Sequence, residues 1–352
     1  MKKLIKSSQI KRFKSINSIV YDNSHVLDAF GANPPWVYIP NRCKTDTIMF
    51  FHDYRKHDNN CFSLILHENT VEFKICDLTF RPAALCHPWE PVLESIHNYF
   101  LDLFGSSVEY RWITSSDIYL SRLPNPQPEL FVPQLRNLSE CRISFHKVAD
   151  AKRVGNYFSS SPVFKHIDLH GVHLPVEYEN ELLAVREEYT PEKLFPPESK
   201  LYLAESVRIE QREMNAPAIL NHFQGRQAIV KCVIFRSLHF IEFINRWKSG
   251  RAFQKLEFLQ IEKIDANGLD FPQVLDRIGV KYIDATKTPP AHTLPKIHLE
   301  FHGDNPNTSP LISHAYIVRK SDNRVASVLI QGRWFKFGVW NKTEEEFLRM
   351  VE

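Results

Sequence analysis

Glycine is scarce in this chain, with 11 residues among 352. Phosphate-binding loops depend on closely spaced glycines, and the sequence contains neither a GxxxxGK[ST] motif nor a GxGxxG motif after an expected strand. The G-x-S-x-G nucleophile elbow and the zinc-binding HExxH pattern are also missing. His239-Phe-Ile-Glu242 comes nearest to the latter but lacks the second histidine. We therefore expect no catalytic residues, no metal and no cofactor, and a protein that is not an enzyme; an enzyme of an unrecognised type stays open as an alternative.

Cysteine is also sparse, and its spacing argues against a disulfide scaffold. No two cysteines form a CxxC pair, and secreted disulfide-rich domains are shorter and denser in cysteine. The six residues are Cys43, Cys61, Cys76, Cys86, Cys141 and Cys232. The sequence shows no apolar stretch typical of a signal peptide and no run near the roughly 20 residues that a membrane helix needs. These features predict reduced thiols in a cytoplasmic or nuclear protein that does not enter a membrane.

A strong net charge is absent as well, because the formal charge is only +3. Nucleic-acid-binding domains usually show a clustered excess of Lys and Arg. Here one cluster stands at the very start of the chain, with no acidic residue before Asp22: Lys2, Lys3, Lys6, Lys11, Arg12 and Lys14. The apolar residues among them fit a short amphipathic helix over 1–20 with its lysines in water. Nucleic-acid binding through this segment stays open as an alternative function.

What the chain has in abundance is core material. Hydrophobic residues make up 43% of the sequence and include 25 Phe, which is ample for one large domain or two ordinary ones. Strands are predicted at 47–52, 62–67 and 71–78, with a hairpin turn at Glu68-Asn69-Thr70. Apolar spacing predicts a helix over 91–104, ended by Gly105. A proline-rich stretch then suggests a domain sub-boundary near 124–135.

Short strand-like segments recur through the second half of the chain. They are Cys141–Phe145, Lys165–Leu169, Ser206–Glu210, Ala228–Phe235, Leu256–Glu262 and Lys281–Asp284. Their spacing of about 24 to 28 residues, with one interval near 40, lies in the range of leucine-rich-type repeats. Helices are predicted at 239–247 and 271–278. Because the strict consensus is absent, we expect a mixed α/β fold of degenerate leucine-rich-repeat-like strand–helix units; an α/β layer without true repeats fits almost as well.

The C-terminal region predicts antiparallel hairpins that flank these units. Strands are expected at 315–319, 324–330 and 334–340, with turns at 321–323 and at Gln331-Gly332. A last helix over 343–350 would be capped by Thr343. The final strand places Trp334 and Trp340 on one face and Phe335 and Phe337 on the other. A base-stacking platform is one interpretation, but packing of at least one face in the core fits the near-neutral charge better.

Two blocks of sequence resemble the nematode F-box-associated domain, type 2. The first, HFIEFINRWKSGRAFQKLEFLQIE, matches a helix that ends in a W-x-x-G turn and continues into a strand. Its matching residues are Trp247, Gly250, Phe253, Leu256, Leu259 and Ile261. The second block matches a strand pair with an aspartate, a basic residue, a small residue and a final aromatic strand. Its matching residues are Asp322, Arg324, Ala326, Phe335, Phe337, Val339 and Trp340.

The resemblance implies a domain over 40–345 that recognises substrate proteins for a cullin-RING ubiquitin ligase. Members of the family usually carry an F-box that binds a Skp-family adaptor. Residues 1–20 resemble only the lysine-rich last helix of that F-box, and the Leu-Pro start and middle helices are missing. The expected partner is therefore an unknown protein, with the adaptor as a second candidate. The residue chemistry makes the matched positions structural, since Gly250 suits a helix end and the leucines suit a core.

Overall fold

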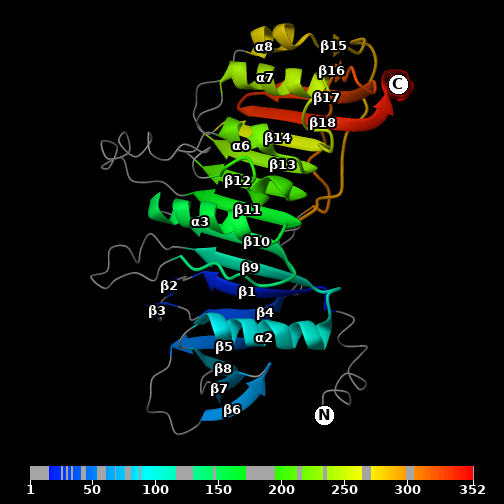
Figure 1. Ribbon diagram of the computed structural model, residues 1–352. Coiled ribbons are helices and arrows are strands. Elements are labelled where there is room, and N and C mark those ends of the chain that lie inside the picture. The colour runs from blue at the N-terminus through cyan, green and yellow to red at the C-terminus, as the bar shows by residue number, and fades with distance from the viewer. Residues whose placement is uncertain are drawn as a thin grey trace. The chain divides into compact units, whose positions relative to one another are not determined.

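The computed structural model of the chain describes residues 16–24, 27–28, 31–32, 35–40, 45–53, 61–67, 69–75, 81–86, 89–115, 130–145, 148–171, 195–211, 216–232, 236–263, 271–298 and 305–351 (Figure 1). The fold is mixed α/β, as the sequence predicts. The chain divides into two compact units, Met1–Phe145 and His146–Glu352, so the sub-boundary expected near 124–135 lies within the first unit.

In its described residues, the first unit is a mixed sheet with one long helix. Its strand order is β10-β9-β1-β4-β5-β8-β7-β6. The strands are β1 (Ser18–Ser24), β4 (Trp36–Pro40), β5 (Thr45–Asp53), β6 (Cys61–Leu66), β7 (Asn69–Ile75), β8 (Pro82–Cys86), β9 (Glu109–Ser115) and β10 (Leu138–Phe145), with a small separate pair of β2 (Leu27–Asp28) and β3 (Gly31–Ala32). Strand β9 pairs in parallel with both β1 and β10, whereas β6 and β7 form an antiparallel hairpin.

Helix α2 (Trp89–Phe104) covers one face of this sheet and packs against β6, β7 and β8. It ends where Gly105 adopts a φ of +85°, as the sequence predicts. Alternation along β9 buries Tyr110 and Trp112. The buried Tyr21 hydroxyl lies 2.8 Å from Nδ1 of His97, and Nε2 of His97 donates to the Arg136 carbonyl at 2.6 Å. A carbonyl can only accept, so the Nε2 nitrogen carries the proton and Nδ1 accepts from Tyr21.

The second unit begins with four parallel strands and ends with antiparallel ones. Its strand order is β15-β16-β17-β18-β14-β13-β12-β11. The strands are β11 (His166–Gly171), β12 (Ser206–Gln211), β13 (Gln227–Cys232), β14 (Phe258–Lys263), β15 (Lys281–Tyr282), β16 (Ala315–Val318), β17 (Arg324–Gln331) and β18 (Trp334–Thr343). The helices are α3 (Val148–Ser160), the 3-10 helix η3 (Lys200–Leu203), α6 (Ala216–His222), α7 (Ser237–Lys248), α8 (Phe271–Ile278) and α9 (Glu344–Leu348).

The core of this unit lies between α7 and the strands β14 and β18. Phe240, Phe243 and Trp247 of α7 are buried, and their rings contact Phe335 and Phe337 of β18. The apolar spacing of α7 thus faces the sheet, as the sequence predicts. Both phenylalanines of β18 are fully buried, which confirms that one face of the aromatic strand packs in the core.

Several expectations need correction. Residues 18–20 belong to β1, so the helix expected over 1–20 does not extend through them, and residues 1–15 lie outside the described part of the chain. The β6–β7 turn begins one residue earlier than expected, because Asn69 and Thr70 already pair within the hairpin. Lys281–Asp284, the sixth of the expected repeat strands, does not continue the parallel series: its residues Lys281–Tyr282 form β15, which pairs antiparallel with β16. The place beside β14 is taken by β18, whose aromatic side chains complete the core over α7.

The C-terminal predictions are confirmed. Strands β16, β17 and β18 are joined antiparallel, and Asn323 and Gly332 adopt positive φ in the two turns. Helix α9 is capped as expected: the Thr343 hydroxyl accepts from the Glu346 N–H at 3.4 Å, and the Glu346 carboxylate accepts from the Thr343 N–H at 2.8 Å. None of the helices in the described part of the chain is long and apolar enough to cross a membrane.

Candidate functional site

The thirteen residues of the resemblance divide into nine that are buried and four that are not. The side chains of Trp247, Phe253, Leu256, Leu259, Ile261, Ala326, Phe335, Phe337 and Val339 are all buried. Strand pairing brings the two blocks together, because Leu259 lies opposite Phe337 and Ile261 lies opposite Phe335. These positions therefore build the core of the second unit and are not a ligand site.

Two of the four remaining matched residues, Gly250 and Asp322, lie at a joint between the end of α7 and the β16–β17 turn. The Arg319 guanidinium lies 5.2 Å from the Trp247 ring centroid, and its Nε donates to Asp322 at 2.8 Å. The hydrogen bond from Arg319 is the main reason that the pKa of Asp322 is lowered. The Lys320 N–H donates to the Lys248 carbonyl at 2.9 Å. Gly250 allows this approach, since a Cβ there would lie 2.5 Å from Ser321 Oγ.

Two matched residues lie away from the joint's centre. Arg324 is half-exposed, and its Nε lies 3.4 Å from Asp322. Trp340 lies on the opposite face of β18 from Phe337, where its Nε1 donates to Ser327 Oγ at 2.9 Å. There it packs against a small second cluster made of Ile283, Tyr316, Val325 and Phe347. Trp340 is thus not paired with Trp334 in an open aromatic surface.

The parallel strands of this unit have two chemically different faces. Every second side chain is apolar and buried, and these side chains share the face on which α7 packs: Ile167, Leu169, Val207, Ile209, Ala228, Val230, Leu259 and Ile261. The side chains between them point to the other side and form what we call the polar face: Asp168, His170, Arg208, Glu210, Ile229, Lys231, Gln260 and Glu262. The strands alternate in this way because successive side chains point to opposite sides.

A row of charged side chains crosses the polar face near the carboxyl ends of the strands. His170, Glu210, Lys231 and Glu262 stand in strict register on β11 to β14. Lys231 Nζ lies 3.3 Å from Glu210 Oε2 and 3.9 Å from Glu262 Oε2. Arg333, in the β17–β18 turn, extends the row, with its Nη2 2.8 Å from Glu262 Oε1. Acidic and basic groups therefore alternate along one line.

The other end of the row is anchored below the surface. His170 Nε2 lies 2.7 Å from Oδ1 of Asp168, whose side chain is 2% exposed. His170 Nδ1 lies 3.8 Å from Glu210 Oε2. The side chains of Lys231 and Glu210 are 31% and 38% exposed, so the middle of the row can meet a partner without rearrangement of the strands.

A second row on the polar face is less charged. Asp168, Arg208, Ile229 and Gln260 stand in register, and Lys336 of β18 continues the line. Lys336 Nζ donates to Ser309 Oγ at 2.9 Å, and burial lowers the pKa of Lys336.

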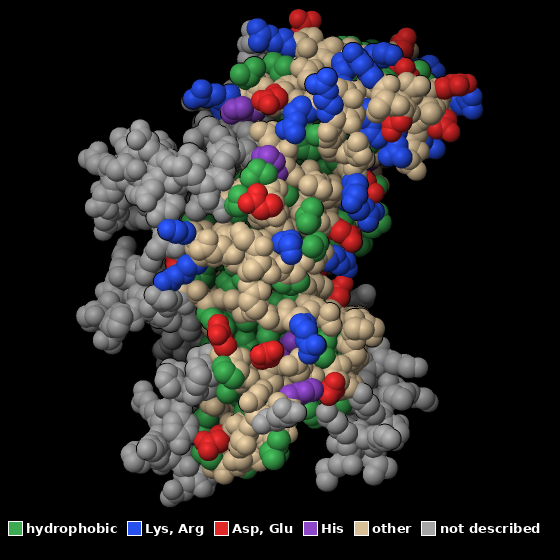
Figure 2. Space-filling model, in the orientation of Figure 1, with side chains coloured by type: hydrophobic (Ala, Val, Ile, Leu, Met, Phe, Trp, Pro, Cys, Tyr) green, Lys and Arg blue, Asp and Glu red, His purple; other side chains and the backbone are tan. Residues whose placement is uncertain are grey.

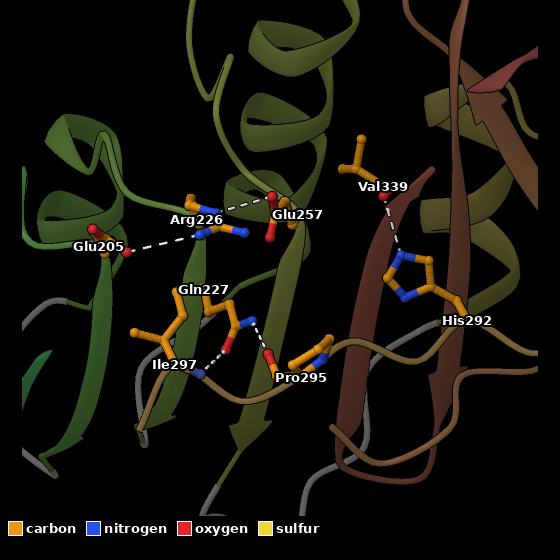
Figure 3. A network of polar contacts seen from close by, with 8 residues as sticks. All are labelled: Glu205, Arg226, Gln227, Glu257, His292, Pro295, Ile297 and Val339. Atoms are coloured by element: carbon orange, nitrogen blue, oxygen red, sulfur yellow. Dashed lines mark hydrogen bonds and ion pairs between the residues drawn. The ribbon is translucent and has the colours of Figure 1, made fainter. Parts of the chain in front are cut away.

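The amino-terminal part of the polar face is covered by the segments 287–298 and 305–311, which we call the strap. Figure 3 shows Gln227 of β13 donating to the Pro295 carbonyl at 2.8 Å and accepting from the Ile297 N–H at 3.2 Å. His292 lies 3.1 Å from the Val339 carbonyl and is seated over Gly338, where a Cβ would lie 2.7 Å from its Nδ1. Burial lowers the pKa of His292. Among the described residues, the strap lies over the amino-terminal part of the face, whereas Lys231 and Glu210 of the charged row are 31% and 38% exposed.

A third surface carries positive charge over α7 and α8, where Lys and Arg side chains gather in the space-filling view (Figure 2). Burial first, and then Lys320 and Lys281, lower the pKa of Lys248. Much of this charge already has a partner: Lys248 Nζ donates to the Ile278 carbonyl at 2.8 Å, and Lys281 Nζ lies 2.7 Å from Glu344. This surface is therefore a weaker candidate than the polar face.

The chemistry of the polar face suits recognition. Within the described ranges, no three His, Cys, Asp or Glu side chains are grouped so as to hold a metal ion. Charged groups that are partly exposed and already paired contribute little to stability. Across an interface, the same arrangement selects a partner with complementary charges and rejects others.

Sequence reasoning missed the charged row, although it found the strands that carry it. The signal was the period-two alternation in Ile-Asp-Leu-His and Val-Arg-Ile-Glu, which places the polar residues on one side of a strand. Alignment of the four strands by their apolar positions would have brought Glu210, Lys231 and Glu262 into one line. No protein-family model, curated protein or solved structure matches this chain.

Proposed function

We propose that this chain is a non-catalytic protein-recognition module of the F-box-associated kind. Its partner would bind on the polar face of β11 to β14. The observation that carries the proposal is the in-register row His170, Glu210, Lys231 and Glu262, in which Glu210 and Lys231 are about one-third exposed and the charges of Glu210, Lys231 and Glu262 alternate. A row of this kind contributes specificity to an interface more than it contributes to folding.

The degenerate repeat is part of this proposal. Strands β11 to β14 are parallel and in register, and α6 and α7 lie between successive strands in the chain. Leucine-rich-type repeats present the side chains of such strands as an extended binding surface. On this reasoning, the partner is a folded protein that contacts several strands at once and carries charges opposite to those of the row.

Affinity capture with a charge-deleted variant tests the proposal. Glu210→Ala combined with Lys231→Ala removes the centre of the row, and both side chains are about one-third exposed, so we expect a stability change of about 1 kcal/mol or less. The matched control is Glu345→Ala with Arg349→Ala, an exposed ion pair on α9. We expect the first variant to lose proteins that the wild type and the control both retain. Equal recovery by all three proteins would contradict the proposed site.

The link to a ubiquitin ligase needs a separate experiment. Purified Skp-family adaptor is mixed with the full chain, and the mixture is followed by size-exclusion chromatography. Co-elution would support a ligase role through the segment that resembles the end of an F-box. Separate peaks would limit the proposal to recognition alone.

A further inference from the structure

Strand β6 is an open edge of the first unit. It stands last in the strand order and pairs on one side with β7, from Cys61↔Lys74 to Leu66↔Asn69, with no break in register. Within the described residues, no strand pairs with its other side. In an antiparallel ladder, every second residue of such a strand points its N–H and C=O away from the neighbour. β6 therefore offers a row of backbone donors and acceptors to a further strand.

The side chains of β6 are apolar and exposed on both faces of the sheet. Phe62 and Leu64 lie on one face and are 41% and 47% exposed, whereas Ile65 on the other face is 77% exposed. The residues opposite the first two, Phe73 and Val71 of β7, are 6% and 1% exposed. The apolar face of the hairpin thus continues from the covered β7 to the uncovered β6. One added strand would bury apolar surface on both sides.

The usual protections of an edge strand are absent from β6. Exposed edges are normally blunted by charged side chains, by proline or by a bulge. The segment Cys-Phe-Ser-Leu-Ile-Leu contains no charge and no proline, and its pairing with β7 shows no bulge. An edge with this composition is expected to be covered by another strand in the functional protein.

We propose that β6 pairs antiparallel with β6 of a second copy of this chain. The absence of charge on β6 favours this partner. A charged strand would have to place its charges against Phe62 and Leu64, whereas a second copy of β6 carries no charged side chain. A two-fold axis between the copies lets each edge satisfy the other, so that both edges are used and the assembly closes as a dimer. This inference concerns a different unit from the polar face and does not depend on the proposed recognition role.

The expected dimer is weak and reversible. One strand of six residues from each copy falls below the roughly 1,200 Å² of total buried surface at which standard specific interfaces begin. Association should therefore depend on concentration over the micromolar range.

Sedimentation velocity of the full chain, from about 1 to about 100 µM, tests the pairing. We expect the dimer fraction to rise with concentration, and Ile65→Lys to weaken association at least about tenfold by placing a lysine in each half of the interface. Because Ile65 is 77% exposed, the lysine has room in the monomer. Leu238→Lys is the matched control, since Leu238 is 64% exposed on α7 in the other unit, and it should dimerise like the wild type.

Three outcomes would overturn the pairing. A wild type that stays monomeric at every concentration would refute the pairing. A dimer that Ile65→Lys leaves unchanged would place the contact elsewhere. Growth into open-ended assemblies would show that the edge is unprotected but that two copies do not pair through β6 as a closed two-fold dimer. Leu64→Lys, on the opposite face of the strand, should lose the dimer as well, so that a folding defect in one variant does not decide the result.

Discussion

Gly250→Ala should destabilise the second unit chiefly through its contact with Ser321. Gly250 ends α7 with a φ of +70°, and the β16–β17 turn lies directly against it. A Cβ at position 250 would meet Ser321 Oγ at 2.5 Å and Ser321 Cβ at 2.9 Å. The hydroxyl could rotate away, but the Cβ is fixed to the backbone, so one of the two segments must move.

The cost has two parts that can be separated. The left-handed backbone conformation costs an alanine roughly 1–2 kcal/mol relative to glycine. The steric conflict adds about 1–3 kcal/mol, as is typical of overpacking. Together, Gly250→Ala should cost roughly 2–5 kcal/mol. Ser321→Gly removes both conflicting atoms, so in that background the same change should cost only the backbone part.

A double-mutant cycle measures the steric part directly. The wild type, both single variants and the double variant are unfolded in urea, and the signal is followed by circular dichroism. We expect the cost of Gly250→Ala to fall by about 1–3 kcal/mol when position 321 is glycine. Gly332→Ala is the control, since Gly332 has a φ of +57° but no atom within 4 Å of its Cβ position. Its cost should be the same in both backgrounds.

An unchanged cost of Gly250→Ala in the two backgrounds would refute the reasoning. It would mean that the end of α7 and the β16–β17 turn do not press on each other. The two matched blocks would then still share the buried core, but the end of α7 and the β16–β17 turn would not form a tight steric contact.

Two further predictions concern buried rings, one in each unit. Trp247→Ala should lower the unfolding free energy by roughly 3–5 kcal/mol, because the indole is fully buried, and an unchanged melting temperature would be incompatible with this placement. Burial lowers the pKa of His97 to about 4, below its ordinary value of 6.5, although the Arg136 carbonyl opposes the shift. The contribution of neutral His97 to stability should therefore be complete above pH 6.5, fall by about 3 kcal/mol between pH 6.5 and 4, and change no further below that, because the unfolded chain binds the proton first. His97→Gln should flatten this dependence in denaturation series at several pH values, and an equal slope in both proteins would rule His97 out as its source.

Local signals were enough to predict many elements of this fold. Helix α2 carries a regular apolar stripe and a glycine at its end, and α8 was predicted over the residues that form it, Phe271–Ile278. The hairpins β6–β7 and β16–β18 follow from alternating strands and short turns. Each of these signals lies within a window of residues that are neighbours in the chain, so no knowledge of the tertiary structure was needed.

The order of the strands could not be predicted in the same way. Strand β18 lies beside β14 although more than 70 residues separate them, and the place it occupies was expected to go to Lys281–Asp284. Those residues look like a strand locally, but β15 is short and exposed and pairs with β16. The choice was decided by burial: Phe335 and Phe337 can complete the core over α7, whereas Lys281 and Tyr282 cannot.

The candidate site and the core share the same four strands, and their separation across the sheet has a consequence for the proposed function. Glu210, Lys231 and Glu262 stand next in sequence to Ile209, Val230 and Ile261, yet they point to the opposite side. The resemblance singles out the buried side, because those residues determine whether the domain folds. Changes at Glu210 and Lys231 leave the packing against α7 in place and cost little stability, since this ion pair is partly exposed. Under the proposed function, partner specificity on this face can therefore change without loss of the fold.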